Sequence, residues 1–343
     1  FAALRPAVGA GADALGVWID HVAQRLEPLF ARRLAEGWVR EGHGDLHLGN
    51  LVLLDGGPTA FDCIEFDPAL RWIDVLCDVG FLVMDLWAQG RRDLAFRFLD
   101  RYLQHTGDHA GLPVLRLCLV YRALVRARVA LLKGAAPAAP EVERYLALVR
   151  TLTRQPRAGR LMITHGLPGS GKSHHALALV EQCGAVRLRS DVERKRLFGL
   201  AAVDDSRARV PGGIYGGDAT ERTYGRLEAL ARIALAAGYP VIVDAAFLQR
   251  DERDRFHAIA RELSCPFTIL HCDAPLAILR QRVLARQAGG ADPSEADVEV
   301  LERLHARQQT LQPDEQARAI DATDDAQALA QRWADHAGCA RAA

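Results

Sequence analysis

The sequence predicts an α/β protein of two domains, with a mainly helical first half and a second half in which helices flank a parallel β-sheet. Three observations lead to this fold class. At 343 residues the chain is long enough for two hydrophobic cores of ordinary size. Apolar residues recur at helical spacing through much of residues 12–129. From residue 160 onward, short apolar runs alternate with helical segments, which favours a parallel sheet covered on both faces.

The composition limits the classes of partner. Lysine plus arginine equals aspartate plus glutamate at 43 each, so no overall field attracts nucleic acid or an anionic membrane. The seven cysteines are scattered without a C-x-x-C pair, which favours reduced thiols over a disulfide or zinc framework. No apolar run approaches the roughly 20 residues of a membrane span, and no signal-peptide layout is present. We therefore expect a cytoplasmic protein with no membrane partner, and the sequence does not specify its oligomeric state.

The first half is predicted to be helical around one hairpin. Residues 12–36 show the apolar spacing of a helix and lead into the polar loop "EGHGDLHLGN" at 41–50. The next segment, "NLVLLDGGPTAFDCIEF", has two β-prone runs around Asp-Gly-Gly-Pro and predicts a hairpin. Residues 74–129 are helical in pattern, with a break at "QHTGDHAGLP", and "PEVERYLALVRTL" forms a last helix. The breaker-rich segment 154–159 is the predicted linker between domains 1–153 and 160–343.

Four strands alternate with helices in the second half. The strands are predicted in "RLMITHG", "AVRLRSD", "PVIVDAAF" and "FTILHCDAP". The long helix before the third strand is expected to begin with a capping box formed by Asp218 and Glu221, and to end at Gly238. Arginine-rich helical segments follow the fourth strand.

The strongest functional signal is "GLPGSGKS", which matches G-x-x-x-x-G-K-[ST] between an apolar strand and a helix. Glycines let backbone N–H groups turn inward around phosphate oxygens, and the helix N-terminus adds positive partial charge. The lysine of such a loop reaches the β and γ phosphates and its last serine binds magnesium. The pattern predicts ATP and Mg²⁺ as ligands, and the alternative is a chance glycine turn before a helix. The predicted nucleotide-binding residues are Gly166, Leu167, Pro168, Gly169, Ser170, Gly171, Lys172 and Ser173.

Two aspartates follow the next predicted strands. Asp191 in "RLRSDVERKRL" stands at a carboxyl edge, where open α/β sheets bind ligands, and could accept a proton from an acceptor hydroxyl. The alternative is that Asp191 is only a helix N-cap. Asp244 in "VIVDAAF" is typical of a strand-end carboxylate that holds magnesium directly or through water, the alternative being a purely structural residue.

A third group of side chains is cationic. Arg280, Arg282 and Arg286 lie in "LRQRVLARQ", and the last two share a helical face. On a closing lid their guanidinium groups would neutralise charge on a transferred phosphoryl group, although arginine-rich surface helices are also common. Three histidines flank the glycine loop, but neither their spacing nor a nearby carboxylate predicts a metal site there. These are His165, His174 and His175.

Residues 160 onward resemble the small P-loop kinases grouped near gluconate kinase, chloramphenicol phosphotransferase and the 5′-hydroxyl polynucleotide kinases. The resemblance rests on "GLPGSGKS", "RSDVERKRL", "VIVDAAF" and the arginine-rich segment. It implies that Asp191 is the general base and that Lys172 and Ser173 clamp the nucleotide. These relatives phosphorylate sugars, antibiotics and nucleic-acid ends, so the resemblance leaves the acceptor open.

Residues 1–153 resemble the C-lobe of the aminoglycoside phosphotransferases, which share the protein-kinase fold. "HGDLHLGN" matches their H-G-D-x-x-x-x-N loop, which implies that Asp45 is a catalytic base and Asn50 a magnesium ligand. Asp62 in "FDCIEF" matches their magnesium-binding aspartate. Asp74 and Asp78 match later structural aspartates.

The whole chain is similar to bacterial proteins described as bifunctional aminoglycoside phosphotransferase and ATP-binding proteins. The catalytic-type loop begins about forty residues into the sequence, where an upstream ATP-binding lobe of on the order of a hundred residues has no room. We therefore expect that lobe to be missing from this sequence, and the working ATP site to be the second one.

The combined expectation is an ATP-dependent phosphotransferase that moves the γ-phosphoryl group to a hydroxyl of a small metabolite. One alternative is a 5′-hydroxyl nucleic-acid kinase, for which the basic cluster in residues 187–196 would bind phosphates. A second alternative is a regulatory module that binds ATP without transferring phosphate.

Overall fold

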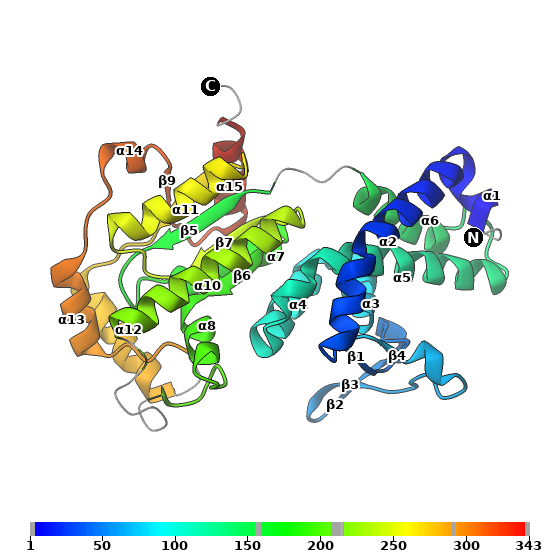
Figure 1. Ribbon diagram of the computed structural model, residues 1–343, viewed down its shortest axis with the longest axis horizontal. Helices are drawn as coiled ribbons and strands as arrows, with labels where there is room; N and C mark the ends of the chain where they lie inside the picture. The colour runs from blue at the N-terminus through cyan, green and yellow to red at the C-terminus, as the bar shows by residue number, and fades with distance from the viewer. Residues whose placement is uncertain (1–3, 155–158, 207–213, 215, 290–291, 340–343) are drawn as a thin grey trace. The chain divides into compact units, whose positions relative to one another are not determined.

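The computed structural model describes residues 4–154, 159–206, 214, 216–289 and 292–339 (Figure 1). Internal contacts divide the chain into two compact units. The first comprises Phe1–Leu99 and Gly111–Pro156, and the second comprises Asp100–Ala110 and Arg157–Ala343. The predicted α/β class, with helices predominating in the first half and a parallel sheet in the second, is confirmed. Part of the predicted linker, 155–158, lies outside the described residues.

The first unit is built from helices and two small antiparallel sheets. Its helices are α1 (Arg5–Val8), α2 (Ala12–Ala35), α3 (Val75–Ala88), the start of α4 (Arg92–Thr106), α5 (Leu112–Leu132) and α6 (Pro140–Thr153). Strand β1 (Val39–Glu41) pairs with β4 (Trp72–Asp74). Strands β2 (Leu51–Leu54) and β3 (Gly57–Ala60) form the hairpin that the sequence predicts. Helix α5 packs against both α3 and α6, and supplies much of this unit's buried apolar surface.

A buried ion pair joins three elements of the first unit. Arg33, near the end of α2, donates from Nε and Nη2 to the Asp74 carboxylate at 2.6 and 2.9 Å. Asp74 also accepts from the Leu76 N–H, at the start of α3. Both charged side chains are almost fully buried, so each needs the other to avoid a large desolvation cost. The pair therefore fixes where α2, β4 and α3 meet.

The second unit contains a five-stranded parallel sheet. Its spatial order is β6 (Val186–Arg189), β7 (Val241–Asp244), β5 (Leu161–His165), β8 (Phe267–His271) and β9 (Ala319–Asp321). The chain starts in the central strand, moves to the edge and returns to β7 beside it. Strands β5 and β7 are buried along their whole length, as expected for a sheet covered on both faces. The carboxyl ends of β5, β6 and β7 therefore share one edge of the sheet.

Helices cover both faces of this sheet (Figure 1). Helices α10 (Gly217–Ala236) and α11 (Arg250–Glu262) pack together, while α7 (Lys172–Cys183) packs against α15 (Ala326–Cys339). The remaining helices are α8 (Ser190–Leu197), α12 (Leu276–Gly289), α13 (Val298–Arg307) and α14 (Pro313–Gln316). In the part of the chain that the structure describes, none of the helices combines the length and the apolar character needed to cross a membrane.

For helix α10, the sequence predicts the C-terminal end correctly and the N-terminal cap incorrectly. The prediction of a capping box at Asp218 is wrong. The N-cap is Gly216, which has no side chain to accept a hydrogen bond, and Asp218 lies in the first turn of the helix. The stop at Gly238 is confirmed. Gly238 has a φ of 84° and its N–H donates to the Leu235 carbonyl. A glycine adopts this left-handed conformation without steric cost, so it ends the helix.

A second buried ion pair joins α11 to α14. The Arg253 guanidinium donates to the Glu315 carboxylate at 2.6 and 3.0 Å, and both residues are about 2% exposed or less. A bidentate pair also joins Arg232 and Glu262 at 2.7 and 2.8 Å, where both side chains are well exposed, but it uses Nη1 and Nη2 instead of Nε and Nη2. The two pairs therefore differ in burial and in the edge of the guanidinium group, and Arg253 Nη1 also donates to the Phe247 and Gln309 carbonyl oxygens.

We predict that Glu315→Ala lowers the free energy of unfolding of the second unit by about 3 kcal/mol or more, because it leaves the Arg253 charge buried and unpaired. Glu262→Ala is the matched control and should lower the free energy of unfolding much less, since water solvates Arg232 once its partner is removed. Urea titrations of both variants measure the difference. Equal losses in the two variants would contradict the assigned role of burial.

Candidate phosphate-binding site

The loop between β5 and α7 requires glycine at three positions. Gly166, Gly169 and Gly171 have φ angles of 147°, 85° and 92°, a region that residues with a side chain rarely adopt. A Cβ atom on Gly166 would lie 2.1 Å from the Cys272 carbonyl oxygen. One on Gly169 would lie 2.9 Å from the Leu279 carbonyl oxygen. The loop is thus packed directly against the backbone that follows β8 and the backbone of α12.

The start of α7 presents backbone donors to this loop. Gly171 is the N-cap and provides no side-chain acceptor, so the first N–H groups of the helix are not capped by a side chain. Leu167 anchors the loop in an apolar cluster with Leu279, Val283 and Leu301. Ser170 Oγ is buried and has no hydrogen-bond partner among the described residues. This combination of a rigid turn and open N–H groups is suited to binding phosphate.

Lys172 is the cation of the loop. Its Nζ donates to the Leu167 carbonyl oxygen at 2.7 Å. Burial lowers the pKa of Lys172, and the nearby charges of Asp244 and Asp191 act in the opposite direction. The positive charge of Arg286 lowers the pKa further. The lysine, both predicted carboxylates and one of the lid arginines therefore share one electrostatic environment.

Asp244 is the last residue of β7 and is 5% exposed. Its Oδ2 has no hydrogen-bond partner among the described residues, but Arg187 Nη1 and Arg189 Nε lie 3.8 and 3.6 Å away. Arg187 Nη1 also donates to the Ser173 carbonyl oxygen at 3.1 Å, so Ser173 and Asp244 adjoin the same guanidinium group. Carboxylate and hydroxyl oxygens are the ligands that Mg²⁺ prefers, so the residue types of Asp244 and Ser173 fit this ion.

Asp191 occupies the second position of α8 and is only partly buried. The N-cap of this helix is Arg189, so the alternative that Asp191 is the N-cap does not describe the structure. Among the described residues, no hydrogen bond or ion pair engages the Asp191 carboxylate, although it raises the pKa of Lys172.

The three arginines of the predicted lid on α12 have different surroundings. Arg282 Nη1 donates to the Gly169 carbonyl oxygen at 3.2 Å and so contacts the glycine loop. Arg286 Nη2 donates to the Ala296 carbonyl oxygen at 2.8 Å, and its Nε is buried without a partner among the described residues. Arg280 instead pairs with Glu302 on α13 at the surface. Arg282 therefore contacts the glycine loop directly, and Arg286 is close enough to Lys172 to affect its pKa.

A segment between α12 and α13 reaches the same edge of the sheet. Lys195 Nζ pairs with Glu295 at 2.9 Å, and Arg189 Nη2 lies 3.6 Å from Asp292. Glu295 also accepts from the Ser206 N–H at 2.8 Å. The sequence analysis did not identify these two acidic residues, because they lie about a hundred positions from their partners and belong to no motif.

In the first unit, the predicted site residues of the polar loop lie together. Asn50 Nδ2 donates to the Asp45 carbonyl and carboxylate oxygens at 3.0 and 3.3 Å, and to the Asp62 carbonyl oxygen at 3.5 Å. Asp62 has a left-handed φ of 61°. A hydrogen bond from His47 lowers the pKa of Asp45 against the effect of burial. The amide nitrogen of Asn50 is thus engaged, and its oxygen is the atom left for a metal.

Two aspartates on α3 hold this loop in place. Asp78 accepts from the N–H groups of His43 and Gly44 at 2.6 and 3.0 Å. Asp85 accepts from the Leu48 N–H and the Tyr145 hydroxyl, both at 2.9 Å. The sequence analysis missed Asp85, although a carboxylate inside the apolar run "GFLVMDLW" is a signal that could have identified it.

Comparisons with known proteins agree with the P-loop assignment of the second unit. Residues 161–311 match a family model described as an AAA domain. Uncharacterized proteins of Mycobacterium tuberculosis and Mycobacterium bovis are 32% identical over 293 residues, which is 84% of this chain. The chain spans 58% of the length of these relatives.

Solved structures with partial similarity each cover about half of the chain. Chaetomium thermophilum Kti12 in complex with ADP-AlF3 is 16% identical over 52% of this chain and 98% of its own, with a TM-score of 0.41. A gluconokinase from Sinorhizobium meliloti is 18% identical over 54% and 94%, with a TM-score of 0.36. The Mycobacterium tuberculosis APS kinase CysC with AMPPNP and APS is 20% identical over 53% and 98%, with a TM-score of 0.38. These TM-scores and identities are too low to support the fold assignment. That assignment rests on the chain's own sheet order and loop geometry.

We predict that Gly166→Ala weakens binding of a fluorescent ATP analogue at least tenfold and lowers the free energy of unfolding by about 2 kcal/mol, because the new Cβ collides with a backbone carbonyl. Gly225→Ala is the control. It lies inside α10 with open space around its Cα and should leave binding unchanged while stabilising the helix by about 0.5–1 kcal/mol. Unchanged binding in Gly166→Ala would show that this loop is not the phosphate site.

Proposed function

We propose that the second unit is an ATP-dependent kinase that transfers the γ-phosphoryl group of ATP to a hydroxyl of a small metabolite. The observation that carries this proposal is the glycine loop at the carboxyl end of β5, with Asp244 at the end of the neighbouring β7 and Asp191 just after β6 on the same edge of the sheet. Both carboxylates raise the pKa of Lys172 against the effect of burial. A phosphate cradle alone would fit any P-loop protein. Asp191, whose carboxylate has no hydrogen-bond partner within the described part of the chain, adds the group that a hydroxyl acceptor requires.

The loop would bind the phosphates through the N–H groups at the start of α7, with Lys172 exchanging its bond to the Leu167 carbonyl for phosphate oxygens. Arg282 and Arg286 would then balance the charge that develops on the transferred group. Ser173 and Asp244 are the residues that would hold Mg²⁺, which neutralises phosphate charge when bound. The guanidinium group of Arg187 donates to the Ser173 carbonyl oxygen and lies 3.8 Å from Asp244, while its bidentate partner is Asp100.

Asp191 would act as the general base. Its carboxylate would accept the proton of the acceptor hydroxyl as the oxygen of that hydroxyl forms a bond to the γ-phosphorus and the bond to ADP breaks. Arg189, directly before Ser190 and Asp191, pairs with Asp244 and would fix the start of α8 at the sheet edge. The products are the phosphorylated acceptor and ADP.

The surroundings of the basic cluster favour a small acceptor over a nucleic acid. Arg187, Arg194 and Lys195 are all less than 10% exposed. Arg194 donates to the Ile214 carbonyl oxygen, and Lys195 pairs with Glu295. Cations that are buried and engaged inside the protein do not form the open basic surface that a phosphate backbone needs. A regulatory module that binds ATP without transfer remains the second candidate.

For the first unit, we propose a second phosphotransferase-like centre related to the aminoglycoside phosphotransferases. Its support is the arrangement of Asp45, Asn50 and Asp62 in a loop that Asp78 and Asp85 hold by backbone hydrogen bonds. The curated relatives are considerably longer than this chain. Any phosphotransferase activity of a full-length protein of this kind is therefore also a proposal.

We predict that Lys172→Ala abolishes ATP-dependent transfer while the protein stays folded, because Lys172 is the first residue of α7, where alanine is a good helix former. A lost phosphate-bound cation typically costs about 10²–10³ in rate. Circular dichroism checks the fold, and turnover of ATP is the measured quantity. Substantial turnover in a folded Lys172→Ala protein would exclude this loop as the working site.

We predict that Asp191→Asn keeps the affinity for ATP and slows transfer by about 10²–10⁴, since the amide preserves the shape but cannot accept the proton. Asp218→Asn is the matched control, because Asp218 also occupies the second position of a helix. The control tests whether loss of a negative charge near a helix N-terminus is by itself enough to slow phosphate transfer. Retained transfer in Asp191→Asn would place the regulatory module ahead of the kinase.

A further inference from the structure

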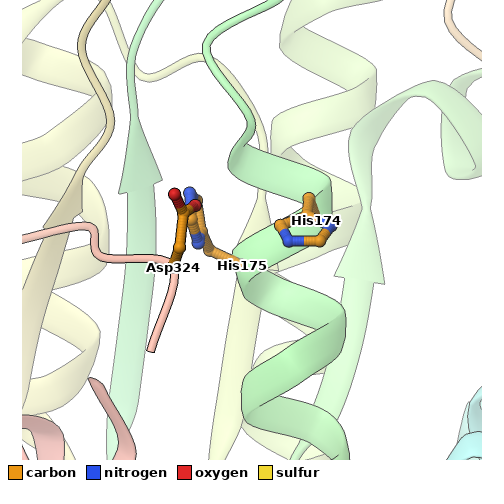
Figure 2. Close-up of side chains that lie close together, drawn as sticks. All are labelled: His174, His175 and Asp324. Carbon is orange, nitrogen blue, oxygen red and sulfur yellow. The ribbon is translucent and has the colours of Figure 1, made fainter. Parts of the chain in front are cut away.

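Three potential metal ligands gather beside α7, outside the catalytic arrangement described above. His174 and His175 lie near the start of this helix, and Asp324 lies in the connection between β9 and α15 (Figure 2). One ligand atom from each residue can be chosen so that all three lie within 4.8 Å of one another. The sequence analysis did not predict this group, because Asp324 is far along the chain and only the fold brings it to the histidines.

The ligand atoms of this group are not used by other described residues. No hydrogen bond or ion pair within the described part of the chain engages the side chains of His174, His175 or Asp324. The two imidazole rings contact each other edge to face, with centroids 5.2 Å apart. His174 and Asp324 are exposed, so both can change rotamer without disturbing a core.

Two imidazole nitrogens and one carboxylate oxygen are a donor set typical of Zn²⁺ and its near neighbours. Metal–ligand bonds of about 2.0–2.2 Å place neighbouring donors of a tetrahedron roughly 3.4 Å apart, so the three groups must approach by an ångström or so. Rotation of the exposed His174 and Asp324 side chains can supply that movement. Water would take the fourth position.

Some charges around these three ligands oppose the binding of a cation, and others favour it. Arg282 is close enough to His175 to affect it, and the first turn of α7 carries positive partial charge. Both disfavour a cation. Asp324 opposes them directly. A metal held by imidazole nitrogens is less sensitive to this balance than one held by charge alone.

We propose that His174, His175 and Asp324 bind one divalent cation of the zinc class, separate from the magnesium site at Ser173 and Asp244. The cation links the helix that starts at the phosphate loop to the connection between β9 and α15. It therefore stabilises the docking of the C-terminal helix, which packs against α7.

The test is calorimetric titration of Zn²⁺ into the full, untagged chain without nucleotide, with Co²⁺ absorption to report a tetrahedral site. We expect one Zn²⁺ per chain. His174→Ala and Asp324→Asn should each weaken binding at least about tenfold, and the double variant should lose the Zn²⁺-dependent rise in melting temperature. His21→Ala, which removes an exposed helical histidine from the first unit, should change neither.

Fold integrity is checked by the melting temperature in the absence of metal, which should be equal in all variants because the replaced side chains at 174 and 324 are exposed. Equal Zn²⁺ affinity in the wild type and the double variant would overturn the proposal. So would a wild type that binds no Zn²⁺ at submillimolar concentration. Neither outcome bears on the kinase proposal, which is tested by phosphate transfer.

Discussion

The close approach of the loop at Gly166 to the carbonyl of Cys272 is the constraint on which the second unit depends. There is room for a hydrogen atom at this position and none for a methyl group. The backbone after β8 occupies that space, and α7 begins at Lys172, whose Nζ donates to the Leu167 carbonyl oxygen in the loop. Asp244 ends β7 and Asp191 lies just after β6, at the same edge of the sheet, while Arg282 and Arg286 come from α12.

Burial of charge organises the surroundings of the loop. Asp244 is nearly inaccessible to water, and two guanidinium groups lie 3.6 and 3.8 Å from its carboxylate. Those arginines come from neighbouring β6, and Arg189 is paired with Asp244 in the strand register. The buried arginines therefore compensate buried negative charge at the site. This explains why a basic run in the sequence does not produce a basic surface.

Much of this arrangement could be predicted from the sequence, and the failures have physical causes. The strand, glycine loop and helix at 160–183 are local features, each determined by neighbouring residues, and so is the hairpin at 51–60. The cap of α10 was mispredicted because a favourable acidic residue stands one or two positions inside the helix. Glu295, Asp85 and Asp324 were missed because each acts on residues distant in sequence, and only tertiary structure determines such pairings.

The central claim is that the second unit moves phosphate from ATP to a small hydroxyl compound. The most direct measurement is to incubate the protein with γ-labelled ATP and fractionated cell extract, and to follow where the label goes. The proposal predicts that label appears in a small organic molecule in the presence of the wild-type protein. Label found only in inorganic phosphate, or only in nucleic acid, would contradict it.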